Sequence, residues 1–236
     1  VPTPPRSFAE LKEWVKANPG KFTYPRPPDF TGSAFIRQAL YALTGGYQQY
    51  MAKLAPELYR KNADALFTYL NGLKPYLWQQ GRTYPKDIAA LDTLFERGEV
   101  LINMSYHQAN AQSRILQGRY QLTVRTFVMK DGSIYNTHFT AVPYNAPNKA
   151  GALVVANFLL SPDAQLSKNN PANWGDFTAL DLNRLEEPAR ARFAALDLGE
   201  ATLPLETLAE FAVPEIPSGY LELLEADWEK KVLRAR

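Results

Sequence analysis

The sequence predicts an α/β fold followed by a helical portion. Short apolar runs with the character of strands alternate with segments of helical periodicity through about the first 145 residues, and helical patterns dominate afterwards. Hydrophobic residues make up 46% of the 236 residues and charged residues 21%, which is ordinary usage for a globular protein that buries a sizeable core. A chain of this length fits one large domain or two modest lobes.

Start and stop signals mark the helices. Residues 7–10 (SFAE) form a capping box, and apolar residues at helical spacing follow it as far as the NPG stop at 18–20. Residues 31–33 (TGS) open a second helix, which Gly45 and Gly46 end. Further helices are expected over residues 56–78, 87–97, 108–116, 148–160 and 219–233. Prolines divide about the last 70 residues into short helical fragments.

Four segments are predicted as strands because they are short and rich in β-branched, aromatic or aliphatic residues. They cover residues 22–24, 100–104, 122–128 and part of 133–142, with a hairpin-like turn signal (KDG) between the last two. We therefore expect residues 1–138 to form an α/β lobe. Residues 139–236 are expected to form the mostly helical part of another lobe, which is incomplete.

The composition excludes several classes of chemistry. The chain has no cysteine and only two histidines, without the spacing of a zinc site, so we expect no metal and no cofactor. It also lacks the GxxxxGK[ST] and GxGxxG phosphate-binding patterns and the GxSxG nucleophile elbow, so no enzyme is indicated. A net charge of +2 gives no nucleic-acid footprint, and no apolar run is long enough to span a bilayer.

The first candidate binding site is the start of the helix at residues 31–33. Free backbone N–H groups and the positive end of the helix dipole point there. Thr31 and Ser33 add hydroxyls, and Gly32 would let a ligand approach the backbone. The alternative is a plain N-cap without a ligand.

The second candidate follows a predicted strand, the third lies inside another predicted strand, and the fourth lies in a loop. Tyr106 and His107 follow the second predicted strand, and ligands of open α/β sheets gather at the carboxyl ends of strands. Tyr135 and Asn136 form an aromatic and polar run inside a strand, and Trp174 lies in a loop. The alternatives are an N-cap or solvent-facing role for the histidine, strand packing for Tyr135 and surface packing for the tryptophan.

Several segments resemble the type II periplasmic solute-binding proteins of ABC importers. Residues 25–35 (PRPPDFTGSAF) are similar to a ligand loop of a YnjB-like branch of that family, which is related to thiamine-, iron- and polyamine-binding receptors. Residues 141–149 (AVPYNAPNK) and 156–165 (ANFLLSPDAQ) resemble the family's apolar strand, APNK turn and FLLSPxAQ helix. The resemblance covers nearly the whole chain.

The resemblance implies two lobes joined by crossing strands, with the solute held in the cleft between them. It implies a periplasmic receptor that delivers a small polar solute to ABC permease subunits. Carried over by position, it places the helix start at 31–33 and Tyr106 in one lobe's share of the ligand site, and Tyr135 and Asn136 in the crossing region. Thiamine-like compounds, polyamines and anions all stay open as ligands. The alternative function is a transferase or hydrolase that uses His107 as a base.

Two features indicate a chain that needs a partner. The sequence begins on a proline-rich, linker-like stretch without a signal peptide, and the family resemblance implies a preceding segment. The helix at 148–160 is apolar on more than one face and needs cover on several sides. We therefore expect either a separate N-terminal fragment or a homo-oligomer.

Overall fold

The computed structural model describes residues 1–235 and divides into two compact units. Unit 1 consists of Val1–Tyr106, Phe127–Asn136 and Leu205–Arg236. Unit 2 consists of His107–Thr126 and Thr137–Pro204. The predicted division into lobes at residue 138 stays a prediction. Among residues 1–235, no helix combines the length and the apolar character needed to span a bilayer.

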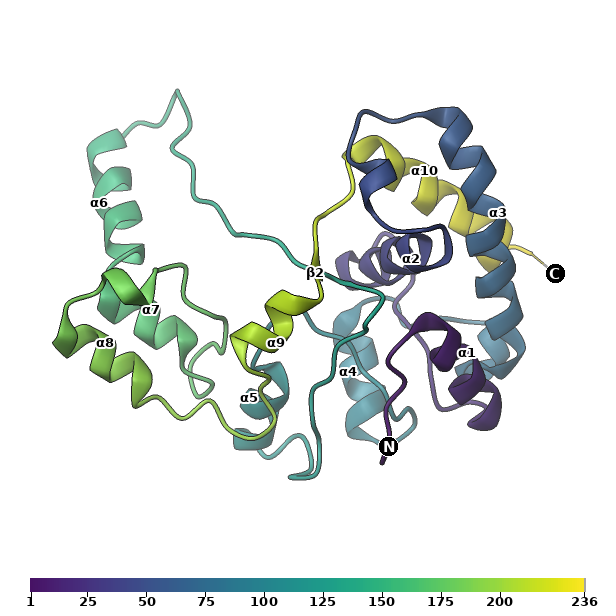
Figure 1. Cartoon of the computed structure of the whole chain (residues 1–236), viewed down its shortest axis with the longest axis horizontal. Helices are drawn as coiled ribbons and strands as arrows, with labels where there is room; N and C mark the ends of the chain where they lie inside the picture. The colour runs from purple at the N-terminus through teal and green to yellow at the C-terminus, as the bar shows by residue number, and fades with distance from the viewer. Residues whose placement is uncertain (236) are drawn as a thin grey trace. The chain divides into compact units, whose positions relative to one another are not determined.

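Helices whose bounds follow the sequence signals build unit 1 (Figure 1). They are α1 (Phe8–Ala17), α2 (Phe30–Leu43), α3 (Pro56–Leu73), α4 (Ile88–Glu96), α9 (Leu205–Glu210) and α10 (Ser218–Trp228), with 3-10 turns at Gln48–Tyr50, Lys74–Tyr76 and Trp78–Gly81 and a π-helical turn at Glu229–Leu233. Ser7 caps α1 as predicted, because its hydroxyl accepts the Glu10 N–H at 3.1 Å. Helix α2 packs against α1, α3 and α10, so it lies at the centre of the unit.

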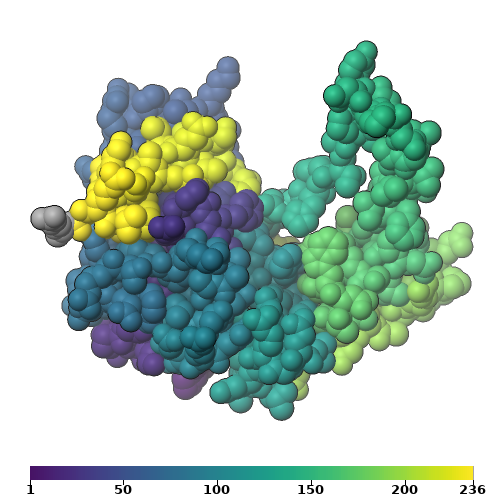
Figure 2. Space-filling view, turned by 180° about the vertical axis from the view of Figure 1, so that it is seen from behind, coloured from purple at the N-terminus to yellow at the C-terminus, as the bar shows by residue number. Residues whose placement is uncertain are grey.

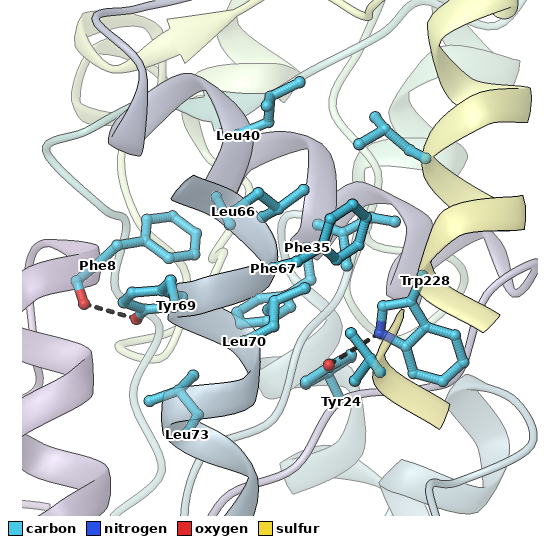
Figure 3. Close-up of a cluster of buried hydrophobic side chains, with 14 of the residues drawn as sticks. Phe8, Tyr24, Phe35, Leu40, Leu66, Phe67, Tyr69, Leu70, Leu73 and Trp228 are labelled. Atoms are coloured by element: carbon cyan, nitrogen blue, oxygen red, sulfur yellow. Dashed lines mark hydrogen bonds between the residues drawn. The ribbon is translucent and has the colours of Figure 1, made fainter. Parts of the chain in front are cut away.

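An aromatic core holds the helices of unit 1 together (Figure 3). The Tyr24 and Phe35 rings stack with centroids 4.5 Å apart, and Trp228 donates its indole N–H to the Tyr24 hydroxyl at 3.0 Å. The Tyr69 hydroxyl donates to the Phe8 carbonyl at 2.6 Å. The core therefore gains the area burial of large rings while these two hydroxyls keep hydrogen-bond partners.

The sheet of the described residues is a single pair of two-residue strands in unit 1. Strand β1 (Ser133–Ile134) pairs in parallel with β2 (Ala212–Val213), in the register Ser133↔Ala212 and Ile134↔Val213. The pair joins two segments that are far apart in the sequence. It confirms only the start of the strand predicted within 133–142, and the structure is helix-rich with little sheet.

The strands predicted at 22–24, 100–104 and 122–128 are wrong. Residues 22–24 are buried, as are Val100 and Ile102 of the second segment. Isolated backbone bonds hold both segments, with Trp78 N donating to Phe22 O at 2.8 Å, Leu101 N to Lys21 O at 2.9 Å and Val100 N to Leu94 O at 3.5 Å. A strand needs a neighbour that supplies successive bonds along a ladder. The third segment begins at Leu122, whose side chain is 78% exposed. Apolar character therefore indicated burial in the first two segments, whereas in the third only Val128 is buried and no residue is paired in a strand.

Unit 2 consists of four helices and long connections. The helices are α5 (Asn110–Leu116), α6 (Lys149–Leu159), α7 (Pro162–Asn169) and α8 (Glu187–Ala194), with a 3-10 turn at Leu182–Arg184. The first two agree with the expected helices at 108–116 and 148–160 to within two residues, and the last two are short helices of the proline-divided portion. Helix α6 buries none of its residues, and it is open to solvent in Figure 2. Val154 is 70% exposed and Phe158 61%, so the predicted exposure of apolar surface on this helix is confirmed.

Candidate functional site

The start of α2 is closed by its own cap. The Asp29 carboxylate accepts the N–H groups of Thr31 at 2.9 Å and Gly32 at 3.0 Å, and its second oxygen accepts the Ile88 N–H at 3.2 Å. The Ser33 N–H donates to the Asp29 carbonyl at 2.8 Å. The donors that the sequence offered to a ligand therefore have partners within the chain, and the negative cap already complements the helix dipole.

Gly32 lies where two parts of the backbone approach each other closely. A Cβ atom at this position would lie 1.9 Å from the Pro25 carbonyl oxygen, a distance that no side chain tolerates. Thr31, Gly32 and Ser33 are all buried. The space expected for a ligand is filled by the extended Pro25 segment, so glycine is required here by the fold of unit 1.

Arg37 lies one turn after Ser33 on α2 and is 3% exposed. Its Nε donates to the Ser33 carbonyl at 2.9 Å, and its Nη1 forms an ion pair with the Glu215 carboxylate. Its Nη2 lies 3.5 Å from both the Phe30 carbonyl oxygen and the Tyr106 hydroxyl. A buried guanidinium needs this many partners, because an uncompensated charge in the interior is very costly.

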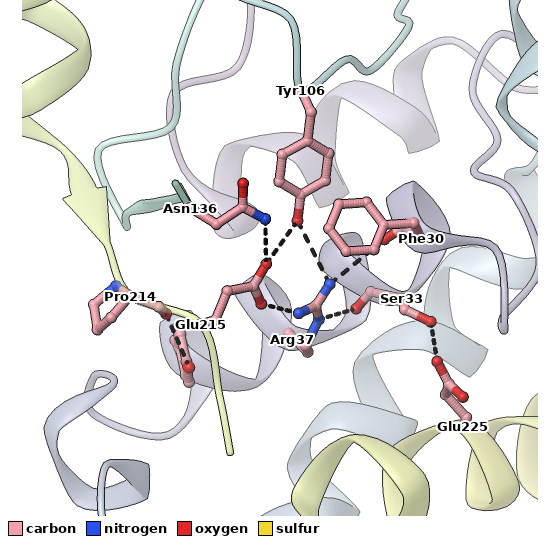
Figure 4. Close-up of polar contacts among 9 residues, drawn as sticks. Phe30, Ser33, Arg37, Tyr106, Asn136, Pro214, Glu215 and Glu225 are labelled. Atoms are coloured by element: carbon pink, nitrogen blue, oxygen red, sulfur yellow. Dashed lines mark hydrogen bonds and ion pairs between the residues drawn. The ribbon is translucent and has the colours of Figure 1, made fainter. Parts of the chain in front are cut away.

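Glu215 collects side chains from three segments of unit 1 (Figure 4). Its Oε2 accepts from Arg37, while its Oε1 accepts from the Tyr106 hydroxyl and from Asn136 Nδ2, both at 3.3 Å. Asn136 and Glu215 each lie two positions after the end of β1 and β2, so the parallel register brings them together. The side chain of Glu215 is 28% exposed, which leaves the carboxylate partly open to solvent.

Aromatic rings stand beside this ion pair. The centroids of Phe30 and Tyr106 are 4.6 Å apart, and the Arg37 guanidinium carbon lies 5.7 Å from the Phe30 centroid. Phe30 is 54% exposed. Burial raises the pKa of the Tyr106 phenol, and the nearby Arg37 charge partly offsets that effect. The phenol is therefore neutral at physiological pH and donates a hydrogen bond to Glu215.

Ser33 reaches a second carboxylate from the same turn of α2. Its hydroxyl donates to Oε1 of Glu225 on α10 in a short hydrogen bond, and Glu225 is half-buried. Ser33 and Arg37 are four positions apart, so the two carboxylates meet one face of one helix (Figure 4). We call Phe30, Ser33, Arg37, Tyr106, Asn136, Glu215 and Glu225 the α2 cluster.

The structure brings together three of the residues selected from the sequence, namely Ser33, Tyr106 and Asn136, through Arg37 and Glu215. Thr31 and Gly32 lie at the same helix start but are buried against the chain itself. Tyr135 is 57% exposed and no hydrogen bond joins its side chain to the cluster among residues 1–235.

The remaining two candidates belong to unit 2. His107 is exposed, and Trp174 is 49% exposed with the Lys168 ammonium 5.5 Å from its ring centroid. Sequence reasoning overlooked Phe30, Arg37, Glu215 and Glu225. Arg37 had a local signal, because it is the one charged residue in the α2 sequence FTGSAFIRQALYAL. Glu215, 178 positions away from Arg37, had none.

No group of histidine, cysteine and acidic side chains suited to a metal ion occurs within residues 1–235. The cluster offers hydrogen-bonding groups, two partly exposed carboxylates and an exposed aromatic ring. Apolar surface beside a few placed polar groups is typical of sites for small organic ligands.

Known proteins place the chain in a family. Residues 1–172 match the model of the bacterial extracellular solute-binding proteins, and the chain belongs to that family. Protein YnjB of Escherichia coli (strain K12) is 39% identical to it over 230 residues, which confirms the predicted YnjB-like branch. The match covers 97% of this chain but 57% of that relative, so the chain spans little more than half of the relative's length. No solved structure matches the chain.

Proposed function

We propose that this protein acts as a receptor that captures a small polar organic solute outside the cytoplasmic membrane, in the periplasm, and delivers it to the permease subunits of an ABC importer. The observation that carries the proposal is the α2 cluster in a chain of the solute-binding family. The cluster offers reversible contacts of the kind that a receptor needs, namely hydrogen bonds and ring contacts, without a covalent step.

In this proposal the solute contacts Tyr106, Asn136 and Glu215 together with the exposed face of Phe30. The buried Arg37 holds the carboxylate in place from behind, so the site keeps its geometry while it is empty. Ser33 acts through its bond to Glu225. The direct contacts of Thr31, Gly32, Tyr135, His107 and Trp174 with a solute stay predictions. The type II two-lobe architecture likewise stays a proposal, supported by the family match.

The alternative function, a transferase or hydrolase that uses His107 as a base, has no specific observation in its favour. Membership in a family of solute-binding proteins supports a receptor without enzymatic activity. Association between copies of the chain also stays a proposal, and the exposed apolar residues of α6 support it.

A solute screen tests the proposed function. Thermal unfolding of the full chain is followed with amino acids, vitamins, polyamines, sugars, organic acids and phosphate, because a ligand that binds only the folded state raises the unfolding temperature. Calorimetry then compares the best solute on the wild type, Tyr106→Ala and Ser33→Ala. We expect both substitutions to weaken binding by about tenfold, the loss of about one hydrogen bond to a charged group.

Tyr144→Ala is the matched control, since Tyr144 is 94% exposed in unit 2. It should leave the affinity unchanged. Affinities that stay within about twofold in both Tyr106→Ala and Ser33→Ala would place the binding site elsewhere. A screen without any stabilising solute would contradict the receptor function itself.

A further inference from the structure

The groups of the α2 cluster that could attract an anion are already engaged. All three donor nitrogens of Arg37 contact oxygen atoms of the chain, and the residue is 3% exposed. The N–H groups at the start of α2 bond to Asp29. An anionic solute would have to displace a carboxylate from a buried guanidinium or from a helix cap, and either exchange leaves a charge of the chain without its partner.

Among the side chains that form hydrogen bonds with the first two turns of α2, carboxylates outnumber cations. Three carboxylates, those of Asp29, Glu215 and Glu225, stand against the single guanidinium of Arg37. The helix dipole adds about half a positive charge at this end and does not reverse the sign. Glu215 and Glu225 are both partly exposed, so their field reaches solvent.

The carboxylates also keep the capacity to accept further hydrogen bonds. A carboxylate offers about four acceptor positions, and Glu215 uses three of them, for Arg37, Tyr106 and Asn136. Glu225 accepts from Ser33 through Oε1, and no donor within residues 1–235 reaches its Oε2. An N–H donor of a solute therefore finds acceptors here.

The aromatic partner of the carboxylates suits a positive charge as well. Phe30 already faces one cation from within, because the Arg37 guanidinium carbon lies 5.7 Å from its ring centroid. The ring is 54% exposed, so part of it is available to a second group from solvent. A cation near an aromatic face gains about 0.5–2 kcal/mol, and more as water is excluded.

We infer that the solute of the α2 cluster is an organic cation, an amine or quaternary nitrogen compound, whose positive group is bound by Glu215 and the aromatic pair of Phe30 and Tyr106, with Glu225 adding negative charge. This inference rests on the proposed function and narrows it. Of the three ligand types that the sequence left open, it retains the thiamine-like compounds and the polyamines and rejects the anions.

Calorimetry with charged probes tests the inference on the full chain at low ionic strength. The cationic probes are choline, spermidine and thiamine, and the anionic probes are citrate and phosphate, with maltose as a neutral probe. We expect at least one cation to bind about tenfold or more tightly than every anion, and its affinity to fall as salt is added.

Two substitutions remove one negative charge each without changing side-chain size. Glu215→Gln and Glu225→Gln should each weaken the binding of the cation by about fivefold or more, whereas Glu13→Gln, a change in an exposed acid of α1, should stay within about twofold. Glu215→Gln also deprives the buried Arg37 of its charge partner. Should that variant fail to fold, Glu225→Gln and the salt dependence decide the question.

Binding of citrate, phosphate or maltose in preference to all three cations would overturn the inference and leave the receptor function intact. Unchanged cation affinity in the folded glutamate variants would also overturn it. A chain that binds none of the six probes contradicts the inference, and the broader thermal screen then decides separately whether the receptor function survives.

Discussion

Apolar side chains are buried in helix α3 of unit 1 but exposed in helix α6 of unit 2. Helix α3 of unit 1 carries four charged residues in its first half, yet it buries seven side chains, and Leu70 is 0% exposed. Helix α6 of unit 2 has one charged residue, Lys149, and buries none; Leu153 is 62% exposed. The difference teaches that burial depends on the surface a helix meets and not on how apolar the helix is. Unit 1 supplies that surface to α3 from α1, α2 and α10, and the part of unit 2 around α6 does not.

The two units also differ in how they pair their least exposed charged side chains. Unit 1 places Arg37 in its interior and supplies Glu215, Tyr106 and backbone carbonyls as partners. In unit 2, Lys168 and Asp176 form an ion pair at 2.9 Å between residues only eight positions apart, at the end of α7. The buried guanidinium with partners from distant segments therefore lies in unit 1, which is where we place the solute.

The largest expected effect comes from matched truncations in the two apolar helices. Leu70→Ala should lower the free energy of unfolding by about 2–5 kcal/mol, because it leaves a cavity in the packed core. Leu153→Ala should change it by less than about 0.5 kcal/mol, since the side chain is largely in water. Urea unfolding of both variants measures the two values. Equal losses would contradict the contrast between the units.

Two glycine substitutions in unit 1 distinguish a glycine that is needed for close backbone packing from one that only lowers helix propensity. Gly32→Ala should destabilise the protein by about 1–3 kcal/mol or more, because its Cβ would collide with the Pro25 carbonyl oxygen. Gly72→Ala, in α3, meets no atom closer than 3.9 Å and should stabilise the protein by about 0.5–1 kcal/mol. The test is the difference in unfolding midpoint between the variants, and a stable Gly32→Ala protein would refute the packing described for α2.

Alkaline pH should unfold unit 1 through its buried phenols. Burial is the main cause that raises the pKa of the phenols of Tyr24, Tyr41, Tyr50, Tyr59, Tyr69 and Tyr84, the last to about 12. Above pH 10, the ordinary value, the unfolded chain loses protons that the folded chain retains, so the free energy of unfolding falls as pH rises from 10 towards 12 and beyond. Well below pH 10 this contribution is fully present.

Urea unfolding at pH 8, 10 and 11, together with the absorbance of tyrosinate, checks this prediction. The stability should already fall between pH 8 and pH 10, where half of the phenols of the unfolded chain are ionised, and fall further at pH 11, and ionisation of the buried phenols should coincide with loss of structure. Ionisation of all thirteen tyrosines near pH 10 in a chain that keeps its fold would show that these phenols are not buried.

The exposed face of α6 gives the smallest effect on stability and a measurable effect on association. We expect the chain to bind a hydrophobic dye in its native state and to show a mass above 26.6 kDa in light scattering at high concentration. Val154→Lys and Phe158→Lys together should reduce both. Leu205→Lys is the control, because Leu205 is 57% exposed in unit 1. A wild-type monomer without dye binding would contradict the prediction.

The sequence predicted the helices well because their signals are local. The cap at Ser7 and the apolar spacing along α2 and α3 lie within the segments that they define. Strands were predicted poorly at 22–24 and 100–104, because a strand depends on a partner and an apolar run reports only burial. Their residues are mostly buried but lack a ladder.

The site was predictable only in part, for the same reason. Ser33, Tyr106 and Asn136 were selected by residue type and by their place at a helix start or a strand. Arg37 and Glu215, which connect them, are 178 positions apart, and no local pattern marks that pairing. The cap at Asp29 shows the converse, since a helix start that could bind a ligand is filled by the residue just before it.

Hydrogen–deuterium exchange with and without the best solute of the screen tests most directly whether the solute binds at the α2 cluster. We predict slower exchange in peptides that cover residues 29–37, 104–106, 134–136 and 213–216 of unit 1, because a bound solute opposes local opening of the segments it contacts. Slower exchange confined to unit 2, for example around residues 168–176, with no change in those four segments, would contradict it.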